Sequence, residues 1–453
     1  MLITLAAPAF AETWYIENGD ITVKASGTEG KNTVSQGNKK DVEDTNTIIT
    51  NQNKDIASSN TVTIDAENDK VEVKLDNVNI KADSGSALTS KGDVTLALNG
   101  DNHLTGGISG TGNYGRNGIA STGSLTISGG ENDSLTAQGG SGADGSYGGH
   151  GIYSNGSLTI SGGTVNATGG DGSNVNGSGI SSNGSVTISG GTVTANGGNG
   201  GNVSGDGIRS GGGVTISGNT VNAAGGNGGK VGGYGICSFD RVAISGGTVE
   251  AAGGSSGSSN GGSGIYSNDI DLSGSLELTA KAGSPNGKAL SQKGSELDLN
   301  AIKDKLGPGA KVTATDADGK VIAQVPIPRP VEPEGPVIPE ESSSSSGGGS
   351  AAPSAPAFSL PGLTVTDKSG AVISYTSTHS GNTLTVCVGR LTASLHVSLA
   401  ALRQLRAEGI ETIAFQTILC STTLSVDELL AMGGEDAEAV LTHRFTDSSL
   451  TVG

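Results

Sequence analysis

The sequence predicts an all-β solenoid, a right-handed parallel β-helix with coils of about 28 residues, followed by a small α+β domain. Three observations predict it. The pair Gly-Ile recurs at Gly118, Gly151, Gly179, Gly207, Gly235 and Gly264. Apolar residues alternate with small polar ones inside each copy, which is the period of a strand. Gly-Gly pairs separate the runs, and a fixed period of this length is typical of a solenoid.

Each copy is expected to form three short strands with two tight corners and one longer loop. Strands this short form no free-standing sheet, so each is expected to pair with its equivalent in the next coil. Aligning the copies predicts three inward columns of aliphatic side chains. They are Ile119, Ile152, Ile180, Ile208, Ile236 and Ile265; Ile127, Ile160, Ile188, Ile216, Ile244 and Leu272; and Leu135, Val165, Val193, Val221, Val249 and Leu276.

Composition divides the chain before and after the repeats. Residues 1–11 resemble the end of a secretory signal with cleavage after Ala11, the alternative being a buried N-terminal strand. Residues 12–84 alternate but are more charged, so we expect a polar cap and the first turns of the β-helix. Residues 85–325 hold the repeats and end in an expected hairpin that turns at Asp318-Gly319. Residues 326–358 are rich in Pro, Ser and Gly, which is typical of a linker.

Residues 359–453 are expected to form the small α+β domain. Ser398 as N-cap and Gly409 as the stop predict one helix, and a capping box that begins at Ser425 predicts a second. Cys387 and Cys420 both lie here, and either a disulfide or two buried thiols fits the sequence. The domain carries no catalytic signature, so an adaptor or spacer role is expected.

The charge of the chain bears on its partners and location. A formal net charge of −18 argues against nucleic acid and anionic membranes as partners. The sequence has no apolar run long enough to span a bilayer. Together with the signal-like start, these observations predict a secreted, extracellular protein, free or associated with the cell surface.

The variable loop before each Gly-Ile is the predicted binding surface. Aromatic rings can pack on the apolar face of a pyranose while polar neighbours take its hydroxyls. The alternative is that Asn, Asp, Gly and Ser are present only because tight turns use them. The predicted ligand-binding residues are Tyr114, Arg116, Tyr147, His150 and Tyr234, and the predicted calcium ligands are Asp144, Asp171 and Asp206.

Residues 45–325 resemble a family of secreted bacterial carbohydrate-binding-domain proteins with right-handed parallel β-helix repeats, of adhesin-like or polygalacturonate-binding type. The resemblance rests on NTVTIDAENDKVEVKLDNVNIKADSGSALTSKGDVTLALNGDNHLTG and on the repeat GIxSxGS[LV]TISGGTV. It implies binding of an acidic polysaccharide with calcium, which would bridge the polymer's carboxylates to an acidic protein. We therefore expect non-catalytic polysaccharide binding. The alternatives are a cell-surface adhesin or structural β-helix with a protein partner, and a polysaccharide lyase or hydrolase.

Overall fold

The structure is a computed structural model of the chain. It describes residues 12–28, 30–109, 114–142, 147–258, 260–326, 363–367, 372–373, 375–380, 382–388, 392–417, 421–432, 438–443 and 448–452. The signal-like residues 1–11, the linker beyond residue 326 and Cys420 lie outside the described residues. The chain forms two compact units, Met1–Pro336 and Val337–Gly453.

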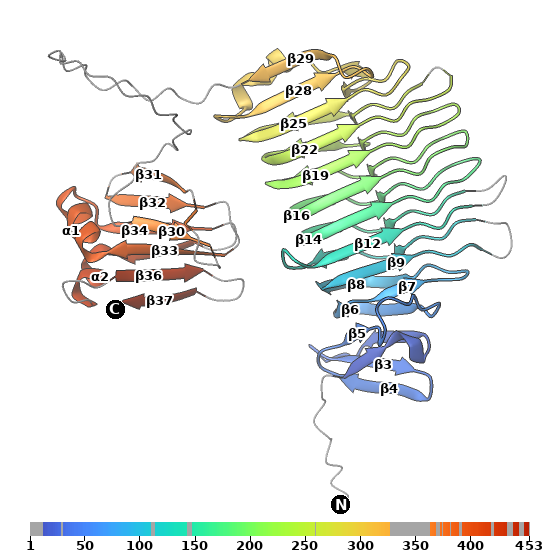
Figure 1. Cartoon of the computed structure of the whole chain (residues 1–453), viewed down its shortest axis with the longest axis horizontal. Coiled ribbons are helices and arrows are strands. Elements are labelled where there is room, and N and C mark those ends of the chain that lie inside the picture. The colour runs from blue at the N-terminus through green and yellow to red at the C-terminus, as the bar shows by residue number, and fades with distance from the viewer. Residues whose placement is uncertain are drawn as a thin grey trace, which may run out of the picture. The chain divides into compact units, whose positions relative to one another are not determined.

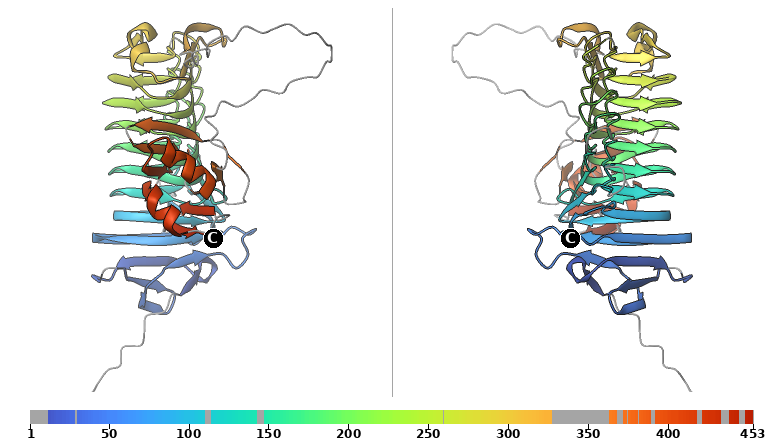
Figure 2. Two further views of the ribbon diagram at one scale, coloured as in Figure 1. Left: turned by 90° about the vertical axis from the view of Figure 1, so that its left-hand side faces the viewer. Right: turned by 90° about the vertical axis from the view of Figure 1, so that its right-hand side faces the viewer.

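The first unit is a parallel β-solenoid of about 11 turns, as the repeat predicts. Its strands stack one above another in every view of the molecule (Figures 1 and 2). Each Gly-Ile opens a short strand that pairs in parallel with its equivalent one coil earlier and one coil later. These short strands are β10 (Ile119–Ser121), β13 (Ile152–Ser154), β15 (Ile180–Ser182), β17 (Ile208–Ser210), β20 (Ile236–Ser238), β23 (Ile265–Ser267) and β26 (Leu290–Gln292).

The rest of each coil forms either one long strand or two shorter ones. In β14 (Leu158–Thr168) and β16 (Val186–Asn196) the second expected corner is a β-bulge, where the pairing register shifts after Ile160 and Gly163 takes a positive φ. Elsewhere the strand is interrupted, as the sequence predicts. The interrupted pairs are β11 (Leu125–Ser128) and β12 (Ser134–Gln138), β18 (Val214–Ile216) and β19 (Asn219–Ala224), β21 (Arg241–Ile244) and β22 (Gly247–Ala252), and β24 (Asp269–Leu272) and β25 (Leu276–Lys281).

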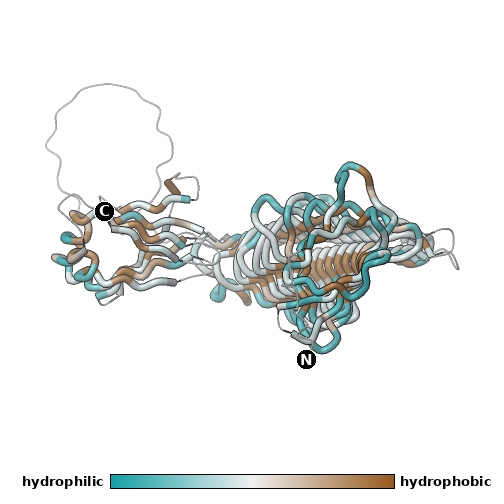
Figure 3. The backbone as a smooth tube through the Cα atoms, turned by 90° about the horizontal axis from the view of Figure 1, so that it is seen from below, coloured by the Kyte–Doolittle hydropathy of each residue, from teal (hydrophilic) through white to brown (hydrophobic). Residues whose placement is uncertain are grey.

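The core is the stack of aliphatic columns inside the coil. Figure 3 shows it as brown, hydrophobic stretches of the backbone in the middle of the solenoid. The first two predicted columns are confirmed by the pairing register. The third is wrong at its last member, because Val249 pairs with Leu278 and Gly247 with Leu276. The coil that contains Leu278 has one more residue between its second and third columns than the coil before it.

Both ends of the solenoid are closed by antiparallel strands, which cover edges that would otherwise pair with other chains. The N-terminal strands are β1 (Thr13–Tyr15), β2 (Ile21–Ala25), β3 (Asn32–Gln36), β4 (Lys39–Asp44), β5 (Ile48–Thr50), β6 (Val62–Asp76), β7 (Asn79–Lys81), β8 (Leu88–Asn99) and β9 (Asp101–Thr105), with a 3₁₀ turn at Ile16–Asn18. The other end has β27 (Ser295–Glu296), 3₁₀ turns at Leu299–Ala301 and Lys303–Lys305, and the predicted hairpin of β28 (Lys311–Thr315) and β29 (Val321–Pro326).

The loop before each Gly-Ile leaves the solenoid and returns as two glycine-rich segments, which we call the glycine arms. In Figure 1 they project beyond the C-terminal ends of β12, β14 and β16. A continuous series of backbone hydrogen bonds joins the arms within and between coils, each 2.7–3.1 Å long. The amides of Gly140, Gly149, Gly170, Gly177, Gly198, Gly205, Gly226, Gly233, Gly254, Gly262 and Gly283 donate in turn to the carbonyl of the preceding member, beginning with Arg116.

The arms pack so closely that their glycines have no room for a side chain. A Cβ atom added to Gly177 would lie 1.7 Å from the carbonyl oxygen of Gly149, and one added to Gly148 would lie 1.9 Å from that of Gly170. Contacts this short are impossible between backbone and a side chain. The Gly-Gly pairs of the sequence therefore serve the close approach of two backbones.

Over its described residues the second unit is the expected α+β domain, with two four-stranded sheets, two helices and its own apolar core. One sheet orders β30 (Leu363–Thr366), β33 (Ala393–Ser398), β36 (Glu438–His443) and β37 (Ser448–Val452). The other orders β31 (Thr376–Ser380), β32 (Thr383–Cys387), β34 (Thr412–Gln416) and β35 (Ser421–Ser425). Both predicted helices are present, α1 (Leu399–Ala407) with Ser398 as its N-cap and α2 (Val426–Met432).

Among the residues that the structure describes, no helix is long and apolar enough to cross a membrane.

Candidate functional site

The outer surface of the short strands carries an alternation of large and small side chains. In each short strand the first and third residues are buried and the middle residue faces outward or lies under a neighbour. Strand pairing aligns these middle residues into one column along the stack. The middle column runs Ala120, Tyr153, Ser181, Arg209, Cys237, Tyr266 and Ser291.

Each large member of the middle column lies against a second planar group. The His150 and Tyr153 rings stack with centroids 5.7 Å apart and planes 16° apart. Tyr234 and Tyr266 stack at 4.8 Å and 21°. The Arg209 guanidinium carbon lies 4.9 Å from the centroid of Phe239, a side chain that is 49% exposed. We call Tyr153, Arg209 and Tyr266 the three stacking positions.

Asp206 fixes the centre of this surface. It is buried, its Oδ1 accepts a 2.8 Å hydrogen bond from the Tyr234 amide, and its Oδ2 accepts a 3.0 Å hydrogen bond from Arg209. Burial raises the pKa of Asp206, while the amide of Tyr234 and the charge of Arg209 act in the opposite direction. Both oxygens are thus engaged inside the protein, which favours a positioning role for a residue predicted to bind calcium.

Asp206 belongs to a column of residues that directly precede the Gly-Ile pairs. The side chain of each accepts a hydrogen bond from the backbone amide of its equivalent one coil later: Asn117 from His150 at 2.8 Å, His150 from Ser178 at 2.9 Å, Ser178 from Asp206 at 3.3 Å, and Asp206 from Tyr234. Burial, and next the charge of Arg209, lower the pKa of His150 to about 4. His150 therefore accepts at Nδ1 as a neutral ring.

A second column of the same kind contains Asp171. Its Oδ1 accepts from the amide of Asn199 at 2.6 Å, Asn199 accepts from Asn227 at 2.9 Å, and Asn227 accepts from Ser255 at 2.7 Å. These contacts favour the alternative in which Asn and Asp serve the turns. Asp144 lies outside the described residues, and within the described part of the chain no three His, Cys, Asp or Glu side chains come together to hold a metal ion.

Tyr114 and Tyr147 lie on the glycine arms, away from the short strands. They are 43% and 44% exposed, and their ring centroids are 5.4 Å apart. Isolated parallel β-bridges align Tyr147 with Val175, Val203 and Val231, one residue in each of the following coils. Arg116 lies on the same arms and donates to Ser109 at 3.2 Å.

The five predicted ligand-binding residues therefore divide between two surfaces. Tyr114, Arg116 and Tyr147 lie on the glycine arms, whereas His150 and Tyr234 lie beside the middle column. Tyr234 belongs to the same predicted loop surface but does not continue the column of Tyr147, because Val231 occupies that place three coils beyond Tyr147. Sequence reasoning also missed Tyr153, Tyr266 and Phe239. The alternation of large and small residues after each Gly-Ile is a signal for Tyr153 and Tyr266, whereas Phe239 lies outside that column.

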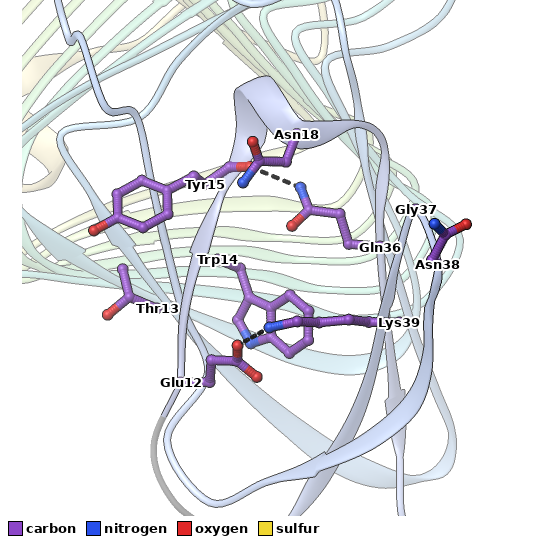
Figure 4. A pocket seen from close by; sticks show the side chains of 9 residues that line it. All are labelled: Glu12, Thr13, Trp14, Tyr15, Asn18, Gln36, Gly37, Asn38 and Lys39. Carbon is purple, nitrogen blue, oxygen red and sulfur yellow. Dashed lines mark hydrogen bonds and ion pairs between the residues drawn. The ribbon is translucent and has the colours of Figure 1, made fainter.

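A pocket of about 480 Å³ lies in the N-terminal cap, apart from both surfaces (Figure 4). Tyr15, Asn18, Gln36 and Lys39 are among its lining residues, and Lys39 extends over the ring of Trp14. Trp14 is buried and its indole N–H donates to Asp44 at 2.8 Å. These contacts hold the first strand of the chain against the cap, and none of the predicted site residues lies there.

Comparison of the chain with protein-family models, with curated proteins and with solved structures gave no match.

Proposed function

We propose that this protein binds polysaccharide without chemically changing it, and that the chain of sugars crosses the short strands and follows the solenoid axis. The observation that carries the proposal is the set of three stacking positions, each supported by a second planar group. Rings held in this way present a flat apolar surface at little cost in side-chain entropy, and sugar rings pack on such surfaces.

Polar groups beside the stacking positions supply partners for hydroxyls. Asn183 donates to the phenol oxygen of Tyr153 at 2.9 Å and to the amide oxygen of Asn155 at 2.8 Å, so these three side chains form one hydrogen-bonding edge. The Arg209 side chain is 42% exposed, and one of its five N–H groups donates to Asp206. Arg209 thus combines a planar surface with donors that face solvent.

The effect of calcium on this binding is a question for the assay, which compares calcium with a chelator. Asp171 and Asp206 already accept backbone hydrogen bonds, and Arg209 offers a positive group that could meet an acidic sugar directly. A secreted or cell-surface location is part of the proposal, and it rests on the signal-like residues 1–11.

Retention on immobilised polysaccharides, with calcium or with a chelator, tests the proposal. The double variant Tyr153→Ala/Tyr266→Ala should lose retention, whereas the matched control Tyr114→Ala/Tyr147→Ala should keep it. If the control loses retention and the first variant keeps it, the glycine arms are the binding surface. A parent protein retained on no polysaccharide in either buffer would overturn the function, and release of reducing ends or unsaturated products would show an enzyme.

A protein partner is the second candidate, because the arms expose a row of apolar side chains. Tyr114, Tyr147 and Val203 are each 40% exposed or more, and Val175 and Val231 continue the row. An uninterrupted apolar row of this kind suits a protein surface better than a hydroxyl-rich sugar. This adhesin-like role takes first place if the parent protein binds no polysaccharide.

A further inference from the structure

The stacking positions fall on every second strand of the stack. Tyr153, Arg209 and Tyr266 alternate with Ser181 and Cys237, which are small and buried. Neighbouring strands lie about 4.8 Å apart, so the stacking positions are roughly 10 Å apart along the solenoid axis. On either side of the stacking positions the column holds small residues, Ser291 toward the C-terminus, and Ala120 followed by Thr89 and Thr63 toward the N-terminus. The surface thus offers three evenly spaced contacts, separated by two positions that offer no stacking group, which we call gaps.

A linear sugar chain can match this spacing in one conformation. A pyranose unit in an extended chain is about as long as one strand spacing, so two units span one interval between stacking positions. In a two-fold ribbon of β-1,4-linked units each sugar is turned by half a rotation relative to its neighbours. Alternate units therefore present the same face on the same side, with the period that the three stacking positions have.

We propose, on the basis of the function proposed above, that the ligand is a linear β-1,4-linked glycan in this ribbon conformation, with units one, three and five on Tyr153, Arg209 and Tyr266. Units two and four pass over Ser181 and Cys237, which are covered by their neighbours and present no stacking group of their own to the ligand. An α-1,4-linked glucan winds as a helix, so its faces do not return to the same side at this period.

A length series of soluble oligosaccharides tests the register. The probes are β-1,4-linked xylo- and manno-oligosaccharides of two to six units, with α-1,4-linked malto-oligosaccharides and oligogalacturonates for comparison, measured by titration calorimetry on the full chain. Affinity should rise about fivefold on adding the third unit and again on adding the fifth, with smaller gains at the fourth and sixth. Equal gains at every unit would overturn the alternation. Equal or tighter binding of an α-linked series would overturn the ribbon.

Two substitutions examine the same geometry from the protein side. Ser181→Tyr fills a gap and should weaken binding of the β-linked pentamer at least fivefold. Phe239→Ala removes the support of the central position, which the trimer and the pentamer both occupy, and should weaken the binding of both. Arg241→Ala is the matched control, since Arg241 pairs with Asp269 and Asp271 in the next coil outside the middle column. If Ser181→Tyr binds as the parent does, the gaps are not part of the site.

The outcomes separate this inference from the function on which it rests. Retention of some polysaccharide combined with failure of the β-1,4 series overturns the ribbon alone. Failure of every polysaccharide, including the polymers, overturns both. Melting curves of each variant, compared with the parent, identify any loss that comes from unfolding.

Discussion

The amide of Ser178 donates a 2.9 Å hydrogen bond to Nδ1 of His150, which occupies the equivalent place one coil earlier. The imidazole thus accepts the same kind of backbone hydrogen bond that Asn117, Ser178 and Asp206 accept in their own coils. Protonation would place an N–H opposite the amide of Ser178 and end the hydrogen bond. A histidine at this place makes one hydrogen bond of the column sensitive to pH.

We predict that acid destabilises the solenoid through His150. In the unfolded chain His150 takes up its proton near pH 6.5, whereas its pKa in the fold is about 4. Between these values the unfolded state binds more protons, so the free energy of unfolding decreases as the pH is lowered. The shift corresponds to a loss of roughly 3 kcal/mol in unfolding free energy by pH 4. The measurement is urea unfolding as a function of pH.

His150→Asn is the control for that prediction, because Asn117 shows that an amide oxygen accepts the same hydrogen bond. The variant should be about as stable as the parent at pH 8 and lose less stability between pH 6.5 and 4. Identical pH profiles of the two proteins would contradict the role given to His150.

Gly177→Ala should damage the glycine arms. The new methyl would lie 1.7 Å from the carbonyl oxygen of Gly149, so the backbones must move apart and hydrogen bonds on both sides of the substitution weaken. We expect a loss of about 1–3 kcal/mol and faster amide hydrogen exchange at Gly170 and Gly198. Gly85→Ala, where a methyl meets nothing within 4 Å, should be nearly neutral. Equal effects of the two substitutions would argue against the packing of the arms.

Ile188→Asp should unfold several coils. Ile188 is fully buried between Ile160 and Ile216, and an unpaired charge there costs several kcal/mol. Its neighbour Thr187 points outward from the same strand and is partly exposed, so Thr187→Asp is the control. Circular dichroism should show a lower melting temperature for Ile188→Asp alone. A parent-like melting curve would count against the stacked core.

Cys237 should be unreactive in the native protein. It is fully buried, and burial, with the charge of Asp206 adding to it, raises the pKa of the Cys237 thiol to about 12. In a variant with Cys387→Ser and Cys420→Ser, labelling by iodoacetamide at pH 8 should require denaturant, because the thiolate is the reactive form. Rapid labelling of the native variant would show that the middle column opens at this gap.

The sequence predicts the fold well because the fold repeats. An alignment at a period of 28 residues places Ile160, Ile188 and Ile216 in register, and strand pairing requires the same register. The prediction fails where the period slips: the extra residue after Leu272 moves Leu278 into the place expected for Leu276. A column is therefore predictable between coils of equal length and not across an insertion.

The candidate surface was only partly predictable, since its contacts join different positions of the coil. Tyr234 precedes a Gly-Ile pair and Tyr266 follows the next one, so no column of aligned residues contains both. Arg209 and Phe239 likewise come from different coils and different positions. Turns do not require tyrosine, so the sequence alone marks the loop tyrosines as candidates, yet the partner of Tyr234 is set by how the loop re-enters the coil.

The hydrogen-bonded series along the glycine arms has a consequence for the history of the chain. Every amide in it donates to a carbonyl that lies earlier in the chain. Each coil therefore accepts one hydrogen bond of the series from the next coil and donates one to the previous coil. A tandem duplication of one whole coil would insert as many donors as acceptors and leave no amide unpaired at the new junction. Unequal crossing-over between neighbouring copies could therefore lengthen or shorten the solenoid in whole coils.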